Sequence, residues 1–343
     1  MPDIITLRRF DDMHCHLRTE QMLRDVLHHT ARYCGRALAM PNTLPPVLSG
    51  DDAKKYRSAI EYEHGLIPQR FPFEPLMSVK LRDDTTPAMI TSAKESGVVA
   101  AKVYPKGVTT NASDGLSDFF GDQITAVFEE MQQLGMILLL HGECDEERVL
   151  VTKREHRFLR IFNYLAERFS GLKIVLEHVS TADGVELVKS LGSNVAATIT
   201  AHHLCMTLND VIGDGIRPHN GCMPMPKDFH DRDALNEAAI SGNPKFFLGS
   251  DSAPHTQEKK ECAKGACGVF TAPILPSLLV EIFEAHGKLG MLNDFTSRFG
   301  AEFYGLPLNQ GEITLVREEW KVPAKYDLVV PFKAGETLQW KLV

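Results

Sequence analysis

Eight short apolar runs, each followed by a longer amphipathic stretch, constrain the fold of this chain more than any other feature. The runs cover residues 10–17, 36–42, 74–81, 98–105, 136–142, 173–179, 195–203 and 245–252. Between them, helical patterns are clearest at residues 51–63, 119–134, 155–169 and 274–286. Short apolar runs are typical of strands buried on both faces, and their alternation with helices favours a parallel sheet with right-handed crossovers. Eight such strands predict an α/β fold, a closed (β/α)8 TIM barrel.

The length of the chain leaves its domain organisation open at first. The 343 residues would allow two domains, but no Gly/Ser linker or shift in composition divides them. No GxGxxG motif follows a strand, which disfavours an open dinucleotide-binding sheet. We therefore expect one barrel domain over residues 1–343, with residues 308–343 as a short C-terminal extension that carries strand-like runs at 312–318 and 328–342.

Charge, hydropathy and cysteine usage limit the classes of partner. A net charge of −8 disfavours a nucleic-acid or anionic-membrane surface. The longest apolar stretches are far shorter than the roughly 18 residues that a membrane span needs, and the first residues lack the apolar region of a secretory signal. The seven cysteines are scattered and form no CxxC pair. A disulfide framework is therefore not expected, and a cytoplasmic location fits.

Histidines follow several of the predicted strands. His14 and His16 close the first strand, where residues two apart share one face, so Cys15 between them points to the other. His141 ends the fifth strand and His178 the sixth. Taken singly, each is more typical of a buried core histidine than of a metal ligand. His202 and His203 follow the seventh strand, and we expect no ligand role for them.

Two charged residues also lie on or directly after predicted strands. Lys102 lies in the apolar run VVAAKVYP and Asp251 follows the run FFLGS, and burial of either charge is expensive unless it is paired. All these side chains sit toward the C-terminal ends of different strands, which is where TIM barrels build active sites. His nitrogen and Asp oxygen are normal Zn²⁺ ligands. A lysine carboxylated by CO₂ is anionic and can bridge two metal ions, which would explain a buried lysine.

In this order and on these strands, the residues resemble those of the amidohydrolase superfamily, and more narrowly the dihydroorotase family in its shorter bacterial class. The resemblance covers nearly the whole chain. It is carried by the strings FDDMHCHLR (10–18), AMPN (39–42), AAKVYP (100–105), TTN (109–111), LLHGE (139–143), LEHVST (176–181), ATITAHH (197–203), RPHNGCMP (217–224), GSDSAPH (249–255) and FYGLP (303–307).

The resemblance implies a zinc hydrolase that interconverts L-dihydroorotate and N-carbamoyl-L-aspartate in pyrimidine synthesis. It implies two Zn²⁺ ions bridged by carboxylated Lys102, and such cations generate a nucleophile from water and polarise the scissile carbonyl. Asp251 would act as general base and then as general acid. The first ion would be held by His14, His16 and Asp251, and the second by His141 and His178.

The same resemblance implies the substrate contacts. Arg18, Asn42 and His255 match carboxylate-binding positions. Arg18 could bind a carboxylate with two hydrogen bonds. Without the resemblance, a solvated arginine after a strand is an equally good interpretation of Arg18. Main-chain groups near Met223 and Cys267 match positions that contact the ring. The segment 105–112 matches a loop that closes over substrate. Thr109 and Thr110 would donate hydroxyl hydrogen bonds from it.

Alternatives remain at this point. A hydantoinase-like or allantoinase-like enzyme would share the metal ligands but not the need for Arg18, Asn42 and His255 together. A non-catalytic homologue would lose ligands, and all six residues are present. A structural zinc at Cys222, Cys262 and Cys267 is disfavoured because paired CxxC spacing is missing. The family suggests a homodimer, and the residues do not decide between Zn²⁺, Co²⁺ and Mn²⁺.

Overall fold

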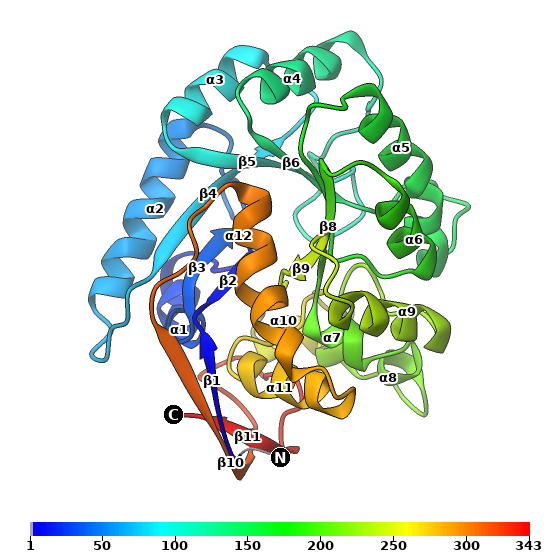
Figure 1. Ribbon diagram of the computed structural model, residues 1–343. Helices are drawn as coiled ribbons and strands as arrows, with labels where there is room; N and C mark the ends of the chain where they lie inside the picture. Colours follow the sequence, from blue (N-terminus) through cyan, green and yellow to red (C-terminus); the bar gives the residue numbers. More distant parts are fainter. Residues whose placement is uncertain (1–2) are drawn as a thin grey trace.

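The computed structural model describes residues 3–343 and centres on an eight-stranded parallel sheet that curls into a barrel (Figure 1). The strands follow one another around the barrel in chain order. They are β2 (Phe10–Cys15), β3 (Cys34–Ala39), β4 (Glu74–Leu81), β5 (Val98–Val103), β6 (Ile137–His141), β7 (Ile174–Glu177), β8 (Val195–Ile199) and β9 (Phe246–Leu248). Each predicted strand is found, and the predicted TIM barrel is confirmed.

The barrel closes between its first and last strands at their C-terminal ends. The backbone N–H of Asp251 donates to the carbonyl of His14 at 2.8 Å, and the N–H of His16 donates to the carbonyl of Ser252 at 3.1 Å. The closure therefore fixes three of the predicted metal ligands to one another through the main chain.

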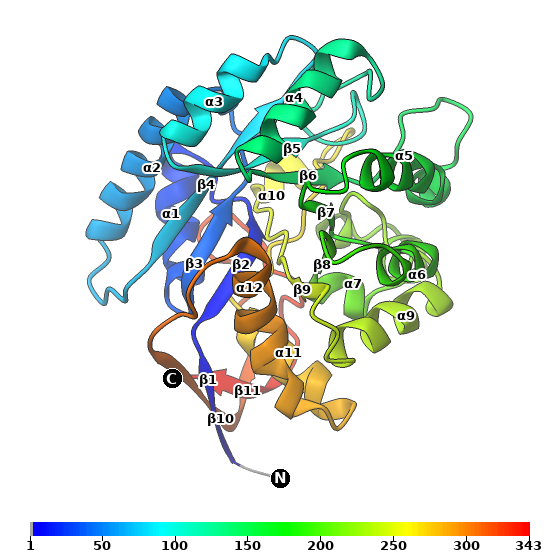
Figure 2. The same ribbon diagram turned by 45° about the horizontal axis from the view of Figure 1, so that its top comes forward.

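Helices surround the barrel on its outside (Figures 1 and 2). The main helices are α1 (Glu20–Ala31), α2 (Gly50–Gly65), α3 (Pro87–Glu95), α4 (Asp122–Gln133), α5 (Arg154–Arg168), α6 (Ala182–Ser190), α9 (Phe229–Ile240) and α11 (Leu275–Ala285). Shorter ones are α7 (Ala201–Cys205), α8 (Asn209–Ile212), α10 (Gln257–Lys260), α12 (Phe299–Tyr304), η1 (Val151–Lys153), η2 (Pro218–Asn220), η3 (Leu289–Met291) and the π-helical η4 (Asp294–Arg298). The four predicted helices correspond to α2, α4, α5 and α11. The predicted run 195–203 is too long, because Thr200 caps α7 and residues 201–203 are helical.

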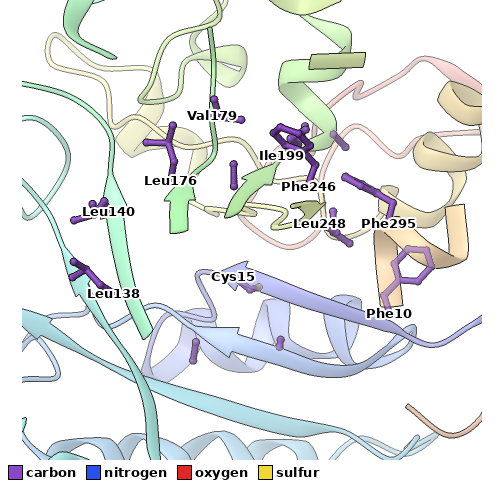
Figure 3. Packing of buried hydrophobic residues seen from close by; sticks show 14 of the residues in the cluster. Phe10, Cys15, Leu138, Leu140, Leu176, Val179, Ile199, Phe246, Leu248 and Phe295 are labelled. Carbon is purple, nitrogen blue, oxygen red and sulfur yellow. The ribbon is translucent and has the colours of Figure 1, made fainter. Parts of the chain in front are cut away.

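Apolar side chains alternate between the two faces of the strands. Leu138, Leu140 and Leu176 belong to the large cluster packed between the sheet and the helices, part of which Figure 3 shows. Their neighbours Leu139 and Val175 belong to a smaller cluster inside the barrel. Side chains therefore change face at every residue, as the strand period requires. On β5 the same alternation places Lys102 on the inner face with Ala100, which belongs to the inner cluster.

A second sheet joins the two ends of the chain. Strand β1 (Ile4–Arg8) pairs antiparallel with β10 (Glu312–Lys321), which pairs with β11 (Thr337–Leu342). Figure 2 shows this sheet beside α11, away from β5 and β6. Both predicted strands of the extension are present, while β1 lies outside every predicted element. Within residues 3–343, the structure contains no helix that is both long enough and apolar enough to cross a bilayer.

Candidate active site

The four predicted histidine ligands meet at the C-terminal mouth of the barrel. The ring centroids lie 5.4 Å apart for His14 and His16, 5.1 Å for His14 and His178, and 4.7 Å for His141 and His178. We call these four histidines, with Lys102 and Asp251, the mouth cluster. Cys15 points away from it, as predicted, because its thiol lies 3.8 Å from the Thr30 hydroxyl of α1.

The Asp251 carboxylate links the two histidines of β2. Its Oδ1 lies 3.1 Å from His16 Nε2 and 3.4 Å from His14 Nε2. Burial alone would raise the pKa of Asp251, but the hydrogen bonds from His14 and His16 hold it well below its ordinary value. One ligand atom each from His14, His178 and Asp251 lies within 4.8 Å of the others, and all three residues are buried. This spacing and donor set fit a metal ion.

Unusual backbone conformations aim two of these side chains. His178 and Asp251 have φ values of 42° and 44°, a left-handed region that non-glycine residues occupy at some cost and mainly at functional sites. The Thr198 hydroxyl accepts from the backbone N–H of His178 at 2.7 Å and holds this turn. Before Asp251, a Cβ added at Gly249 would lie 2.9 Å from His14 Cβ, so only glycine fits this close approach.

Two buried glutamates stand behind the histidines. Glu177 accepts from the His14 Nδ1–H and, at 2.8 Å, from the Thr198 hydroxyl, and Glu143 lies 2.9 Å from His141 Nε2. Burial alone would lower the pKa of His14, but the Glu177 and Asp251 carboxylates together more than offset it and the pKa is raised. A carboxylate on one ring nitrogen fixes the tautomer and leaves the other nitrogen free to bind a metal. The sequence analysis missed both glutamates, although they lie inside the strings LLHGE and LEHVST.

Lys102 is fully buried beside these rings. Its Nζ has no hydrogen-bond partner within the described residues 3–343 and lies 5.2 Å from the centroid of the Tyr104 ring. Burial lowers the pKa of Lys102 to about 8. A buried, unpaired ammonium is expensive, so this position favours a lysine that has been modified or that has lost its proton.

A pocket lies directly above the mouth cluster. Its volume is about 30 Å³, which is room for only about two or three water molecules. It brings together all seven predicted substrate-binding residues with ligands of the mouth cluster and with Tyr104. The lining includes Arg18, Asn42, Thr109, Thr110, Met223, His255, Cys267, His14, His16, His141, His178 and Asp251.

Polar contacts hold the predicted carboxylate-binding residues in place. Arg18 has a φ of 61°, and its Nε donates to the carbonyl of Pro254 at 3.0 Å. Its Nη2 lies 3.1 Å from His255 Nε2, which also lies 3.1 Å from the carbonyl of Cys267. Burial, together with the Arg18 charge, lowers the pKa of His255 to about 2, so the ring is neutral. The guanidinium therefore supplies the positive charge of this wall.

The segment 105–112 lies over the pocket, as a lid would. The Asn42 amide donates to the carbonyl of Thr110 at 2.6 Å. The lid and the second strand of the barrel are thus joined at the pocket wall.

A second group of buried potential ligands was not expected from the sequence. His202, His203 and Cys222 offer ligand atoms within 4.8 Å of one another. We call these three residues the second histidine cluster. His203 Nδ1 lies 2.8 Å from the Thr200 hydroxyl and its Nε2 lies 3.0 Å from the carbonyl of Pro224, so both ring nitrogens already have partners.

Comparisons with known proteins agree with this site. No protein-family model matches the chain. A dihydroorotase of Vibrio vulnificus is 47% identical over 344 residues, covering 98% of this chain and 99% of the relative. The crystal structure of a Campylobacter jejuni dihydroorotase superposes with a TM-score of 0.91 at 37% identity, covering 100% of this chain and 98% of that one.

A dihydroorotase of Saccharomyces cerevisiae, solved in complex with 5-fluoroorotic acid, gives a TM-score of 0.89 at 32% identity and covers 100% of this chain and 99% of that one. These full-length similarities decide against the hydantoinase-like and non-catalytic alternatives. Dihydroorotases are metal-dependent hydrolases with small-molecule substrates, and the mouth cluster offers a matching set of ligands. The chain belongs to the dihydroorotase family of the amidohydrolase superfamily, enzymes of pyrimidine biosynthesis.

Proposed function

We propose that this chain hydrolyses the cyclic amide of L-dihydroorotate reversibly to N-carbamoyl-L-aspartate, with two Zn²⁺ ions held by the mouth cluster. His14, His16 and Asp251 would hold one ion, and His141 and His178 would hold the other. Lys102, once carboxylated at Nζ, would supply an anionic oxygen ligand to the pair. The observation that carries this proposal is the convergence of six side chains from five different strands on one point at the barrel mouth.

The chemistry of the donor set supports two cations. His141 Nδ1 and His178 Nε2 lie 3.2 Å apart and are fully buried, a close approach of two nitrogen donors that a shared cation would stabilise. The His178 Nδ1 and Lys102 Nζ atoms are buried without a hydrogen-bond partner in the part of the chain that the structure describes. Carboxylation of Lys102 would replace an unpaired cation with an anionic ligand. When bound, two zinc ions lower the pKa of water and polarise the amide carbonyl.

Asp251 moves the proton. Its carboxylate reaches the pocket from the end of β9 and accepts hydrogen bonds from His14 and His16, so it is ionised and able to take up a proton. In ring opening, one carboxylate oxygen takes a proton from the attacking water and then delivers it to the ring nitrogen that leaves. General acid–base groups of this kind contribute roughly 10²–10⁴-fold to a rate.

The pocket wall supplies the specificity. Arg18 binds the substrate carboxylate with its guanidinium, and the Asn42 amide and the His255 ring assist. Main-chain groups at Met223 and Cys267 contact the ring. These residues line the same pocket as the metal ligands, which supports binding of a ring that carries a carboxylate beside its scissile amide.

The lid excludes water. Thr109 and Thr110 donate hydroxyl hydrogen bonds to the substrate when the lid is closed, and the lid opens for exchange. The small volume of the pocket, about 30 Å³, supports this motion because a dihydropyrimidine can enter the pocket only when the lid moves aside.

Three broader proposals accompany the reaction. The chain is a single domain over residues 1–343, with residues 308–343 as decoration, which the packing of Trp340 on α11 supports through its bond to Glu284 at 3.1 Å. The enzyme works in the cytoplasm as a homodimer. It has no nucleic-acid or membrane partner, in keeping with its net charge of −8.

The test is Asp251→Asn in the full chain. We expect ring opening of dihydroorotate to fall about 10²–10⁴-fold, with bound zinc retained because the amide oxygen can still act as a ligand. Wild-type protein should hold two zinc ions per chain by elemental analysis, and intact-mass measurement should find one CO₂ on Lys102. Near-normal turnover of the variant would contradict the role of Asp251. Fewer than one metal per chain with an unmodified Lys102 would contradict the binuclear centre.

A further inference from the structure

A second lysine, Lys80, is buried at the end of β4 with its ammonium group against the lid. Its side chain is 2% exposed. Its Nζ donates to the carbonyl of Asn111 at 2.9 Å and forms an ion pair with Asp114. Both partners belong to the loop that follows β5. A buried ammonium is stable only when it is paired and hydrogen-bonded. This loop therefore supplies the hydrogen-bond acceptor and the negative charge that stabilise the buried Lys80.

Strand geometry explains why Lys80 points toward the lid and not into the helices. Along β4, Leu76 belongs to the cluster inside the barrel, while Met77 and Val79 belong to the outer cluster. Lys80 therefore shares the inner face with Leu76. In the register of β4 and β5 it lies beside Lys102. Lys80 Nζ lies 5.9 Å from the centroid of the Tyr104 ring, so it reaches the level of the pocket.

The lid has a folded base to which Lys80 binds. The N–H of Leu116 donates to the carbonyl of Tyr104 at 3.0 Å, and the N–H of Lys106 donates to the carbonyl of Leu116 at 3.1 Å. Asp114 lies within this base and is also 3.6 Å from Arg82 Nη1. Asn111 adopts a φ of 57°. The contacts of Lys80 thus hold the base and the tip of one loop together.

The lid also separates two cavities. Thr109 and Thr110 line the inner pocket, while Asn111 lines an outer cavity of about 320 Å³. The two cavities share Arg18, Asn42 and His255 in their walls. Displacement of residues 109–111 would join them and give a substrate a path to the metal ligands. Two contacts oppose this displacement, from Asn42 to the carbonyl of Thr110 and from Lys80 to the carbonyl of Asn111.

We propose that Lys80 is a positioning residue that sets the fraction of lid held closed over the substrate, through Asp114 and the carbonyl of Asn111. This role rests on the proposed function of the lid. Lys80 does not touch the substrate. When its ammonium group is removed, the closed lid becomes one conformation among several, and the apparent affinity for substrate falls with the equilibrium constant for lid closure over bound substrate.

The experiment compares Lys80→Met, Asp114→Asn and Lys80→Arg in the full-length enzyme. For Lys80→Met and Asp114→Asn we expect KM for dihydroorotate to rise about tenfold while kcat changes less than about threefold, because a tenfold smaller equilibrium constant for lid closure weakens apparent affinity about tenfold while most of the bound complex stays closed. Lys80→Arg keeps the charge and should restore KM in part. The double variant Lys80→Met with Asp114→Asn should add little to either change alone.

A second readout needs no catalysis. Lys106 is an exposed residue of the lid, so trypsin can report how often the lid opens. We expect cleavage after Lys106 to be several-fold faster in Lys80→Met and Asp114→Asn than in wild type. The matched control is Lys189→Met, which breaks an exposed lysine–glutamate pair with Glu186 on α6 and should change neither KM nor cleavage.

The outcomes separate this inference from the proposed function. If wild type opens dihydroorotate while Asp114→Asn keeps wild-type KM and cleavage rate, the inference is wrong and the proposed function stands. If Lys80→Met raises KM only together with loss of bound zinc, Lys80 acts through the metal centre and the inference is also wrong. If wild type has no activity on dihydroorotate, the proposed function fails, and the cleavage rates still decide whether Lys80 holds the lid. Should Lys80→Met not fold, Asp114→Asn decides, because the Asp114 side chain is 40% exposed.

Discussion

The mouth cluster and the second histidine cluster lie at the same end of one barrel and are both largely buried, but different groups lie behind their rings. Carboxylates of Glu177 and Glu143 contact His14 and His141. Behind His203 stand a hydroxyl and a main-chain carbonyl. A carboxylate makes an imidazole a stronger metal ligand, whereas neutral partners fix the ring without adding charge. Closeness of potential ligands is common to both clusters and does not distinguish them.

The pKa values repeat this contrast at His14 alone, because burial lowers the pKa of His16 to about 4 and also lowers the pKa values of His141 and His178. The Glu177 carboxylate raises the pKa of His14 in spite of complete burial. Burial lowers the pKa of His203 to about 4, and it lowers the pKa of His202 well below its ordinary value. The second histidine cluster is therefore neutral and has no carboxylate among its three members. We interpret it as a packed structural cluster.

The largest effect should come from removal of one ring of the mouth cluster, and removal of one ring of the second histidine cluster is the comparison. His178→Ala should lower bound zinc from two ions to about one per chain and ring opening by at least about 10³-fold, since metal ions contribute several kcal/mol of transition-state stabilisation. His202→Ala should keep two zinc ions and most of the activity. Elemental analysis and a dihydroorotate assay measure both. Loss of zinc from His202→Ala would show that the second cluster also binds metal.

A smaller effect is expected from removal of the Glu177 charge behind the His14 ring. Glu177→Gln keeps the shape of the side chain but removes its charge, and it should weaken zinc affinity about 10–100-fold, as loss of a carboxylate behind a metal-binding histidine does. Competition with a chelator of known affinity measures this. Glu186→Gln on exposed α6 removes one surface carboxylate and serves as the control. Equal affinities in both variants would mean that Glu177 has only a packing role.

The sequence predicts the mouth cluster well because its signal is local. An apolar run gives the strand, and a histidine, lysine or aspartate at its end is placed at the barrel mouth by the rules of parallel sheets. The roles of Glu143 and Glu177 were missed because they depend on how each ring is turned, which strand spacing does not determine. Lys80 was hidden in the same way, since EPLMSVKL contains nothing to show that a loop more than 30 residues later would pair with it.

Non-local contacts account for the other differences. Strand β1 has only five residues, IITLR, and its partner β10 lies some 300 residues away, so neither pattern nor length identifies it. The second histidine cluster forms because the loop that carries Cys222 folds back beneath α7. Both features depend on tertiary packing, which outweighs local propensity.

Acid should destabilise the second histidine cluster. The ordinary pKa of histidine is about 6.5, and His203 in the fold has a pKa of about 4. Between these values the unfolded chain binds a proton that the folded chain does not. The contribution of neutral His203 to the free energy of unfolding is therefore complete above pH 6.5 and is lost as pH falls toward 4. The loss attributable to His203 should reach about 2 kcal/mol at pH 5.

Urea unfolding of wild type and His203→Asn at pH 7 and pH 5 measures this loss. The variant should be less stable at pH 7, but it should lose about 2 kcal/mol less than wild type on acidification. The other titrating groups are common to both proteins and cancel in the difference. Parallel pH dependence in the two proteins would mean that His203 is protonated in the fold and that the second cluster is not neutral.

The smallest effect belongs to the hydroxyl that fixes the second cluster. Thr200 accepts from the backbone N–H of His203 at 3.1 Å as the cap of α7, and it also bonds the His203 ring. Thr200→Val keeps the shape but removes both contacts, so the free energy of unfolding should fall by about 1–2 kcal/mol. Zinc content should not change, because the side-chain hydrogen bonds of Thr200 within residues 3–343 join it to His203 and not to the mouth cluster. The matched variant Thr198→Val removes the hydroxyl that bonds Glu177 and His178, and it should lower both stability and zinc affinity. If the two variants lost zinc equally, the separation of the clusters into a metal-binding and a structural one would fail.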